Sequence, residues 1–191
     1  PVKLAAIPLD DKGLQVNLLA ETLERLTRAG ERPVLLYTIP TFQNPSGVTL
    51  DPVRRLRLLE LAHQYGLLVV EDDVYRDLYF EQEPPASLYA LDTDDIVIRL
   101  GSFSKILAPG LRLGWLMGPA GHVRRLVESC LSSSGGGAKP LAASVVAAFC
   151  EQSWLEPHIE LLRERYRHRR DVLLETLAAH MPAGVRWTRP A

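Results

Sequence analysis

The sequence predicts an α/β fold, in which a mostly parallel sheet is flanked by helices. Four short apolar runs, each next to proline, glycine or acidic residues, are typical of buried strands. These runs lie at residues 34–39, 67–70, 96–100 and 113–117. Segments with apolar residues at helical spacing follow the first run and the last. Strands alternating with helices in this way are typical of an α/β layer fold.

The helix that follows the first strand has clear start and stop signals. Asp51 is a favourable N-cap residue, Pro52 suits the first helical position, and Gly66 is typical of the residue that follows a helix. Further helices are predicted at roughly 120–131, 139–151 and 155–180. Such sheets bind ligands beyond the carboxyl ends of their strands, so polar residues at those ends are the first candidates for a site.

The length of 191 residues allows one domain, or one domain and part of another. We expect residues 1–150 to form part of a larger domain, and residues 151–191 to begin a smaller one. The first residue is Pro1 rather than methionine, so we also expect that the chain begins inside a longer protein.

Composition and charge exclude several classes of function. The formal net charge is −1, which gives no general attraction to nucleic acid or to an anionic membrane. No apolar run is long enough to span a bilayer. The histidines and the 2 cysteines show no metal-ligand spacing, and a reduced, cytoplasmic setting is expected. A basic run at 163–170 falls in the last predicted helix, where we expect the arginines mainly on the solvated face.

One lysine follows the third predicted strand, in the segment Ser102 to Lys105. A desolvated lysine has a lowered pKa and is a competent amine nucleophile for Schiff-base formation. The hydroxyls of Ser102 and Ser104 can hydrogen-bond a phosphate. Arg112 lies seven residues after Lys105, and its guanidinium matches phosphate with two parallel hydrogen bonds. A surface lysine and an arginine that caps a strand are the alternative interpretation.

Three further candidates follow the first two strands. Asp72 ends an apolar strand, so we expect it to be partly buried and to need a cationic partner, such as a protonated pyridine nitrogen. Tyr75 is close enough in sequence to act on the same ligand. The alternative for Asp72 is a helix N-cap or part of a metal site. Asn44 lies in Asn44-Pro45-Ser46-Gly47, a common turn sequence, from which its side chain can reach a phenolate oxygen.

Together and in this order, residues 39–47, 70–75 and 101–114 resemble the class I and II aminotransferases, which are fold-type I pyridoxal-phosphate (PLP) enzymes. The resemblance is strongest to the 2-aminoadipate aminotransferase-like branch, which includes the aminotransferase-like domains of MocR-type transcription regulators. It covers nearly the whole chain. It implies the large domain of an aspartate aminotransferase-like fold, followed by the start of the small C-terminal domain.

The resemblance also implies a role for each candidate residue. Lys105 would form the internal aldimine with PLP and later carry the α-proton, while Asp72 would pair with the pyridine nitrogen. Tyr75 and Asn44 would hydrogen-bond the ring hydroxyl. The residues implied for the phosphate are Ser102 and Arg112, with Ser104 as a weaker candidate.

The implied activity is transamination between an α-amino acid and a 2-oxo acid in a homodimer, without a metal ion. In the family, the glycine-rich phosphate turn and the aromatic residue stacked on the ring precede residue 1. The arginine for the substrate carboxylate follows residue 191. We therefore expect an internal part of a longer subunit. The alternatives are another PLP reaction such as β-elimination, an effector-sensing domain of a transcription regulator, and a segment that folds without binding PLP tightly.

Overall fold

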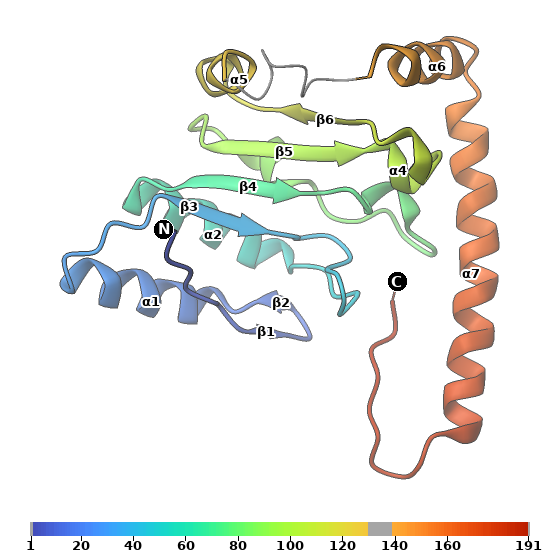
Figure 1. Ribbon diagram of the computed structural model, residues 1–191. Helices are drawn as coiled ribbons and strands as arrows, with labels where there is room; N and C mark the ends of the chain where they lie inside the picture. Colours follow the sequence, from blue (N-terminus) through green and yellow to red (C-terminus); the bar gives the residue numbers. More distant parts are fainter. Residues whose placement is uncertain (1, 130–138, 191) are drawn as a thin grey trace.

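The computed structural model describes residues 2–129 and 139–190. A four-stranded sheet lies at its centre, in the order β3-β4-β5-β6 (Figure 1). The first three strands are parallel and β6 is antiparallel to β5, which confirms the predicted α/β class and the mostly parallel sheet. The strand bounds are Leu35–Thr38 for β3, Leu68–Asp72 for β4, Val97–Ser102 for β5 and Gly114–Met117 for β6.

The helix α2, Pro52–Tyr65, forms where the sequence predicts it. The Asp51 side chain accepts a hydrogen bond from the backbone N–H of Val53 at 2.9 Å. Gly66 adopts φ 63°, in the left-handed region that glycine enters without strain. The predicted caps at both ends of this helix are therefore confirmed.

Residues 2–34 supply elements that the sequence reasoning did not predict. A short antiparallel pair, β1 (Leu9–Asp10) and β2 (Gly13–Leu14), precedes helix α1 (Val16–Arg28). Buried residues of α1 recur at helical spacing: Val16, Leu19 and Leu23. They join a core with α2 and with one face of the sheet, which is represented by Leu36, Val69 and Val97. Helices α1 and α2 thus cover the same face of the sheet, which buries alternate residues of each strand.

Short turns and helices follow the carboxyl ends of the strands. The 3₁₀ turn η1 (Arg76–Leu78) and helix α3 (Leu88–Leu91) come after β4. Helix α4 (Phe103–Ile106) and the 3₁₀ turn η2 (Pro109–Leu111) come after β5. These elements carry or flank most of the candidate residues.

The last three helices also agree with the predicted segments. They are α5 (Ala120–Val127), α6 (Pro140–Glu151) and α7 (Leu155–His180). The predicted end of the first of them, residues 130–131, lies outside the described residues. Helix α7 passes the carboxyl ends of the parallel strands (Figure 1).

The arginines of residues 163–170 lie mainly on the solvated face, as expected, because Arg165, Arg167 and Arg169 are exposed, but the expectation is wrong for Arg163 and Arg170. Arg163, Arg167 and Arg170 recur along one side of α7 and contact η1 or the segment that follows it. Arg163 Nε donates to the carbonyl of Asp77 at 2.7 Å, and Arg167 donates to that of Phe80. Arg170 is buried, and its Nη1 donates to Glu81 at 2.9 Å. Backbone carbonyls and carboxylates therefore satisfy these guanidinium groups, and the helical pattern alone could not show their contacts with residues 77–81.

Arg55 on α2 organises the loop that carries Asn44. Its side chain is fully buried. The guanidinium donates to the carbonyl of Pro40 at 2.8 Å, to the carbonyl of Leu50 at 3.0 Å and to Thr41 Oγ1 at 3.1 Å. Pro40 and Leu50 flank the loop, so one charged side chain holds both of its ends.

The same guanidinium compensates a buried carboxylate in β4. Arg55 Nη1 lies 3.9 Å from Glu71 Oε1, and both side chains are fully buried. Glu71 also accepts hydrogen bonds from the backbone N–H groups of Leu88 at 2.8 Å and Tyr89 at 2.9 Å. Burial raises the pKa of Glu71 and lowers the pKa of Arg55. The charged state of each group thus depends on its partners.

We predict that Arg55→Met lowers the free energy of unfolding by about 3–5 kcal/mol, because it leaves Glu71 without a cationic partner in a buried site. Arg57→Met is the matched control on the same helix. Arg57 pairs with Glu60 at 2.8 Å in an exposed position, so its loss should change stability by less than about 1 kcal/mol. Urea unfolding followed by circular dichroism measures both variants. Equal effects would contradict the proposed role of the buried network.

Candidate active site

The candidate residues gather at the carboxyl ends of the three parallel strands. Asn44 lies in the loop after β3, Asp72 is the last residue of β4, and Ser102 is the last residue of β5. Asp72 and Leu100 are paired in the register of β4 and β5. Lys105 lies on α4, which begins directly after β5. The parallel alignment brings these ends to one edge of the sheet, as expected.

Only one of the two carboxylate oxygens of Asp72 accepts a hydrogen bond from the described residues. Its Oδ2 accepts a hydrogen bond from Tyr37 Oη at 2.6 Å. Its Oδ1 is buried and has no hydrogen-bond partner among the described residues. The residue is partly buried, as predicted. A buried acceptor without a donor is costly, so Oδ1 is suited to a donor supplied by a ligand.

Sequence reasoning missed Tyr37, which it treated only as part of a strand. In the sheet, Tyr37 pairs with Val70, and Val70 lies on the same face as Asp72 because side chains alternate along a strand. The Tyr37 hydroxyl can therefore reach Asp72 diagonally across the two strands. Partial burial and the hydrogen bond to Asp72 raise the pKa of Tyr37 to about 12. The alternation of side chains along β3 places Tyr37 on one face of the sheet. Only the register of β3 against β4 shows that this residue lies near Asp72.

Asn44 and Tyr75 approach each other, as expected for two residues that act on one ligand oxygen. Asn44 Nδ2 lies 3.5 Å from Tyr75 Oη, a long contact for a hydrogen bond. The turn that presents Asn44 is closed by Gln43, whose Oε1 accepts hydrogen bonds from the backbone N–H of Ser46 at 3.0 Å and from its hydroxyl at 2.5 Å. Gly47 takes φ 70° in this turn, which glycine allows without strain.

Lys105 lies beside Tyr75, with its Nζ 5.5 Å from the centre of the tyrosine ring. The expectation of a desolvated lysine is not met in this chain, because Lys105 is exposed. Ser102 caps α4: its Oγ accepts from the backbone N–H of Ser104 at 3.1 Å. The hydroxyl hydrogen of Ser102 is then still available to a ligand.

Arg112 and Ser104 are less closely tied to the other candidates. Arg112 is exposed and adopts φ 50° at the end of η2. Across residues 2–129 and 139–190, no hydrogen bond or ion pair joins the Arg112 side chain to Ser102 or Lys105. The expected phosphate-binding pair of Ser102 and Arg112 therefore stays a prediction.

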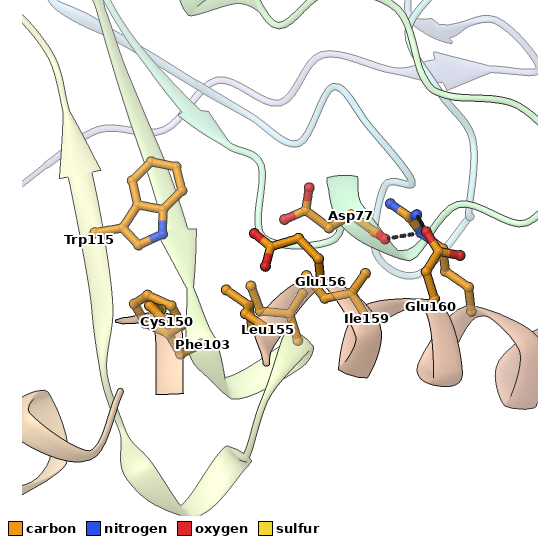
Figure 2. A pocket seen from close by; sticks show the side chains of 10 residues that line it. Asp77, Phe103, Trp115, Cys150, Leu155, Glu156, Ile159 and Glu160 are labelled. Carbon is orange, nitrogen blue, oxygen red and sulfur yellow. Dashed lines mark hydrogen bonds and ion pairs between the residues drawn. The ribbon is translucent and has the colours of Figure 1, made fainter. Parts of the chain in front are cut away.

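Two cavities lie near these residues, but neither Lys105 nor Asp72 lines them. The larger, of about 1080 Å³, runs along β3 and includes Tyr37 and Gln43. The smaller, of about 400 Å³, lies between α4, β6 and the start of α7. Figure 2 shows this smaller cavity, which is lined by Glu156 on α7, Asp77 on η1 and Trp115 on β6. Lys105 itself is exposed in this chain.

Asp73, next to Asp72, also has a buried Oδ1 without a hydrogen-bond partner among the described residues, but its other oxygen is held by a cation. Asp73 is buried, and its Oδ2 pairs with Arg99 Nη2 at 2.8 Å. Burial raises the pKa of Asp73, and Arg99 opposes this shift. Of the two neighbours, only Asp72 has its carboxylate beside the Tyr37 hydroxyl.

In the part of the chain described, no group of three or more His, Cys, Asp or Glu side chains is placed to hold a metal ion. Within the same residues, no helix combines the length and apolar character needed to cross a membrane.

The chain belongs to the family described as Aminotransferase class I and II, whose sequence model matches residues 2–191. It is 44% identical to aromatic-amino-acid aminotransferase 1 of Thermococcus litoralis, over 96% of this chain and 44% of that protein. It is 34% identical to a 2-aminoadipate transaminase of Thermus thermophilus, over 98% of this chain and 46% of the relative. The predicted family and its 2-aminoadipate-like branch are therefore confirmed.

Two other similarities bear on cofactor and function. The crystal structure of kynurenine aminotransferase from Pyrococcus horikoshii, in complex with PMP, has a TM-score of 0.90 and 45% identity. The match covers 96% of this chain and 45% of that one. An uncharacterized HTH-type transcriptional regulator of Bacillus subtilis is 34% identical over 100% of this chain and 38% of its own length. The chain thus spans less than half of the length of each of these four proteins, and the fold is that of the PLP-dependent aminotransferases.

The residues at the strand ends fit PLP, the cofactor that the family and the PMP complex indicate. The open Oδ1 of Asp72 suits a protonated ring nitrogen. Asn44 and Tyr75 offer donors within reach of one oxygen, and Lys105 is the lysine beside them.

We predict that substitutions of two neighbouring aspartates affect different properties, the stability of the fold and the affinity for PLP. Asp73→Asn should lower the free energy of unfolding by about 3 kcal/mol, because Arg99 loses a buried ionic partner. Asp72→Asn should cost less than about 1 kcal/mol, because the new side chain can still accept from Tyr37. If Asp72 pairs with the ring nitrogen, as the resemblance implies, only Asp72→Asn should remove that charge and so weaken PLP binding about tenfold or more.

Urea unfolding and titration of PLP by absorbance measure the two properties separately. Unchanged PLP affinity in Asp72→Asn would refute the assigned role of this carboxylate. An equal loss of stability in both variants would refute the distinction between the two sites.

Proposed function

We propose that this chain forms the cofactor-binding core of a PLP-dependent aminotransferase that acts on an α-amino acid and a 2-oxo acid. The proposal rests on the buried Oδ1 of Asp72, which has no hydrogen-bond partner among the described residues. This oxygen lies at the strand edge that also holds Lys105. The family and the aminotransferase relatives support it.

Each residue has a distinct task in this proposal. When bound, PLP supplies an electron sink for the carbanion that develops at the substrate α-carbon. Asp72 Oδ1 would accept a hydrogen bond from the ring nitrogen and so favour its protonated state. Lys105 Nζ would hold the cofactor covalently before substrate binds, and its free amine would then carry the proton between the substrate α-carbon and the cofactor. Asn44 Nδ2 and Tyr75 Oη would donate to the ring oxygen.

The phosphate group of the cofactor would be held at the end of β5. Ser102 can donate its hydroxyl hydrogen, since its Oγ already accepts from the N–H of Ser104. Arg112 adds a cation that can make two parallel hydrogen bonds to phosphate. Ser104 is kept as the weaker candidate.

The setting of the site supports further proposals. Lys105 is exposed and lines neither cavity, so we infer that other segments complete the pocket. We propose that these come from the rest of the subunit and from a second subunit in a homodimer. We also propose that residues 151–191 begin a smaller domain after residues 1–150, that the protein is cytoplasmic, that it serves amino-acid metabolism, and that this segment binds no nucleic acid.

A second candidate function is the sensing of an effector within a transcription regulator. The observation that favours it is the similarity to the HTH-type regulator of Bacillus subtilis over the full chain. The same residues would then bind PLP and an amino-acid effector without rapid turnover. Mixing the PLP-loaded protein with amino acids separates the two functions: release of a 2-oxo acid with conversion to the aminated cofactor supports the aminotransferase.

We predict that borohydride reduction of the PLP-treated protein labels Lys105 above all. The sequence has four lysines, Lys3, Lys12, Lys105 and Lys139, so peptide mapping has few outcomes. Lys105→Ala should abolish the dominant label and transamination in the full-length protein. Lys139→Ala, which alters an exposed residue before α6, should change neither. Label spread over all four lysines, or transamination retained in Lys105→Ala, would refute the proposal.

A further inference from the structure

Tyr37 makes the one side-chain hydrogen bond that Asp72 receives within the described residues. Its Oη donates to Asp72 Oδ2 at 2.6 Å, a distance typical of a strong hydrogen bond to a charged acceptor. The two residues are 35 positions apart in sequence and come from adjacent strands. This bond therefore fixes the carboxylate relative to the sheet rather than relative to its own loop.

We propose that Tyr37 is a positioning residue, which holds the Asp72 carboxylate so that Oδ1 faces the ring nitrogen of the bound cofactor. The inference rests on the proposed PLP site and adds a residue that the motifs do not contain. Tyr37 would not touch the cofactor in this role. It would act through Asp72 alone.

The geometry explains why Asp72 needs such a partner. A carboxylate at the end of a side chain can rotate, and a single hydrogen bond to one oxygen restricts the direction of the other. Glu71 and Asp73, on either side, point to the opposite face of the strand and are held by their own partners, which include Arg55 and Arg99. Neither of those cations bonds to Asp72, so the orientation of Asp72 depends on Tyr37.

The state of the tyrosine suits this task. The pKa of Tyr37 is raised to about 12 by partial burial and by the hydrogen bond to Asp72. The hydroxyl therefore remains protonated, and remains a donor, over the pH range in which aminotransferases are assayed. A residue of the same shape without the hydroxyl would keep the ring packing and lose only the donor.

The test is Tyr37→Phe in the full-length protein, with Tyr65→Phe as the control. Tyr65 ends α2 and packs against the core, away from the strand ends. Two properties are measured: the dissociation constant of PLP, and the pH midpoint of the absorbance change of the bound cofactor. Tyr37→Phe should weaken PLP binding about tenfold. It should also move the midpoint upward by about half a pH unit or more, because a less firmly protonated ring nitrogen withdraws less charge from the Lys105 nitrogen.

A double-mutant cycle shows whether Tyr37 acts through Asp72. In an Asp72→Ala background, Tyr37→Phe should change neither property further. A Tyr37→Phe protein with unchanged affinity and midpoint would overturn the inference, as would an equal effect in the presence and absence of Asp72. If wild-type protein takes up no PLP at Lys105, the proposed function fails together with this inference. If wild-type protein binds PLP at Lys105 and only Tyr37→Phe has no effect, this inference fails and the proposed function stands.

Discussion

The parallel hydrogen bonding of β3, β4 and β5 is the constraint on which the rest of the site depends. It brings the carboxyl ends of three strands to one edge, although Asn44, Asp72 and Lys105 are far apart in sequence. The register also places Tyr37 diagonally opposite Asp72. A shift of one residue in this register would turn the hydroxyl toward the helix-covered face.

The side chains of three consecutive acidic residues at the end of β4 point alternately to the two faces of the sheet. Glu71 and Asp73 point to the buried face, where burial raises the pKa of each and where Arg55 and Arg99 oppose that shift. Asp72 points to the other face and keeps one buried oxygen without a partner among the described residues. The two outer carboxylates pair with arginines, whereas the central one accepts a hydrogen bond from Tyr37 and pairs with no cation among the described residues.

Much of this arrangement could be predicted from the sequence. Short apolar runs gave the four strands of the main sheet, and strong caps at Asp51 and Gly66 gave α2. The motif order gave the family. Helix α1 was missed because its apolar stripe has no capping side chain at its start. The contacts of Arg163 and Arg170 with the domain were missed because helical periodicity shows which residues share a face, but not which partner covers that face.

The candidate residues came from the sequence, whereas several of their contacts needed the structure. Asn44 and Tyr75 meet as expected, whereas Tyr37 required the register between two strands. The desolvation expected for Lys105 is absent in this chain, because desolvation depends on segments that pack over the residue rather than on its own sequence. Local patterns therefore define which groups are present, and tertiary packing defines how each is tuned.

The central claim is that the Asp72 carboxylate faces the ring nitrogen of bound PLP and stabilises its protonated state. The most direct measurement is the ¹⁵N NMR shift of PLP that is labelled at the ring nitrogen and bound to the full-length protein. We expect the shift of a protonated pyridine that persists well above neutral pH and is lost in Asp72→Ala. An unprotonated ring nitrogen in the wild-type protein at neutral pH would contradict the claim.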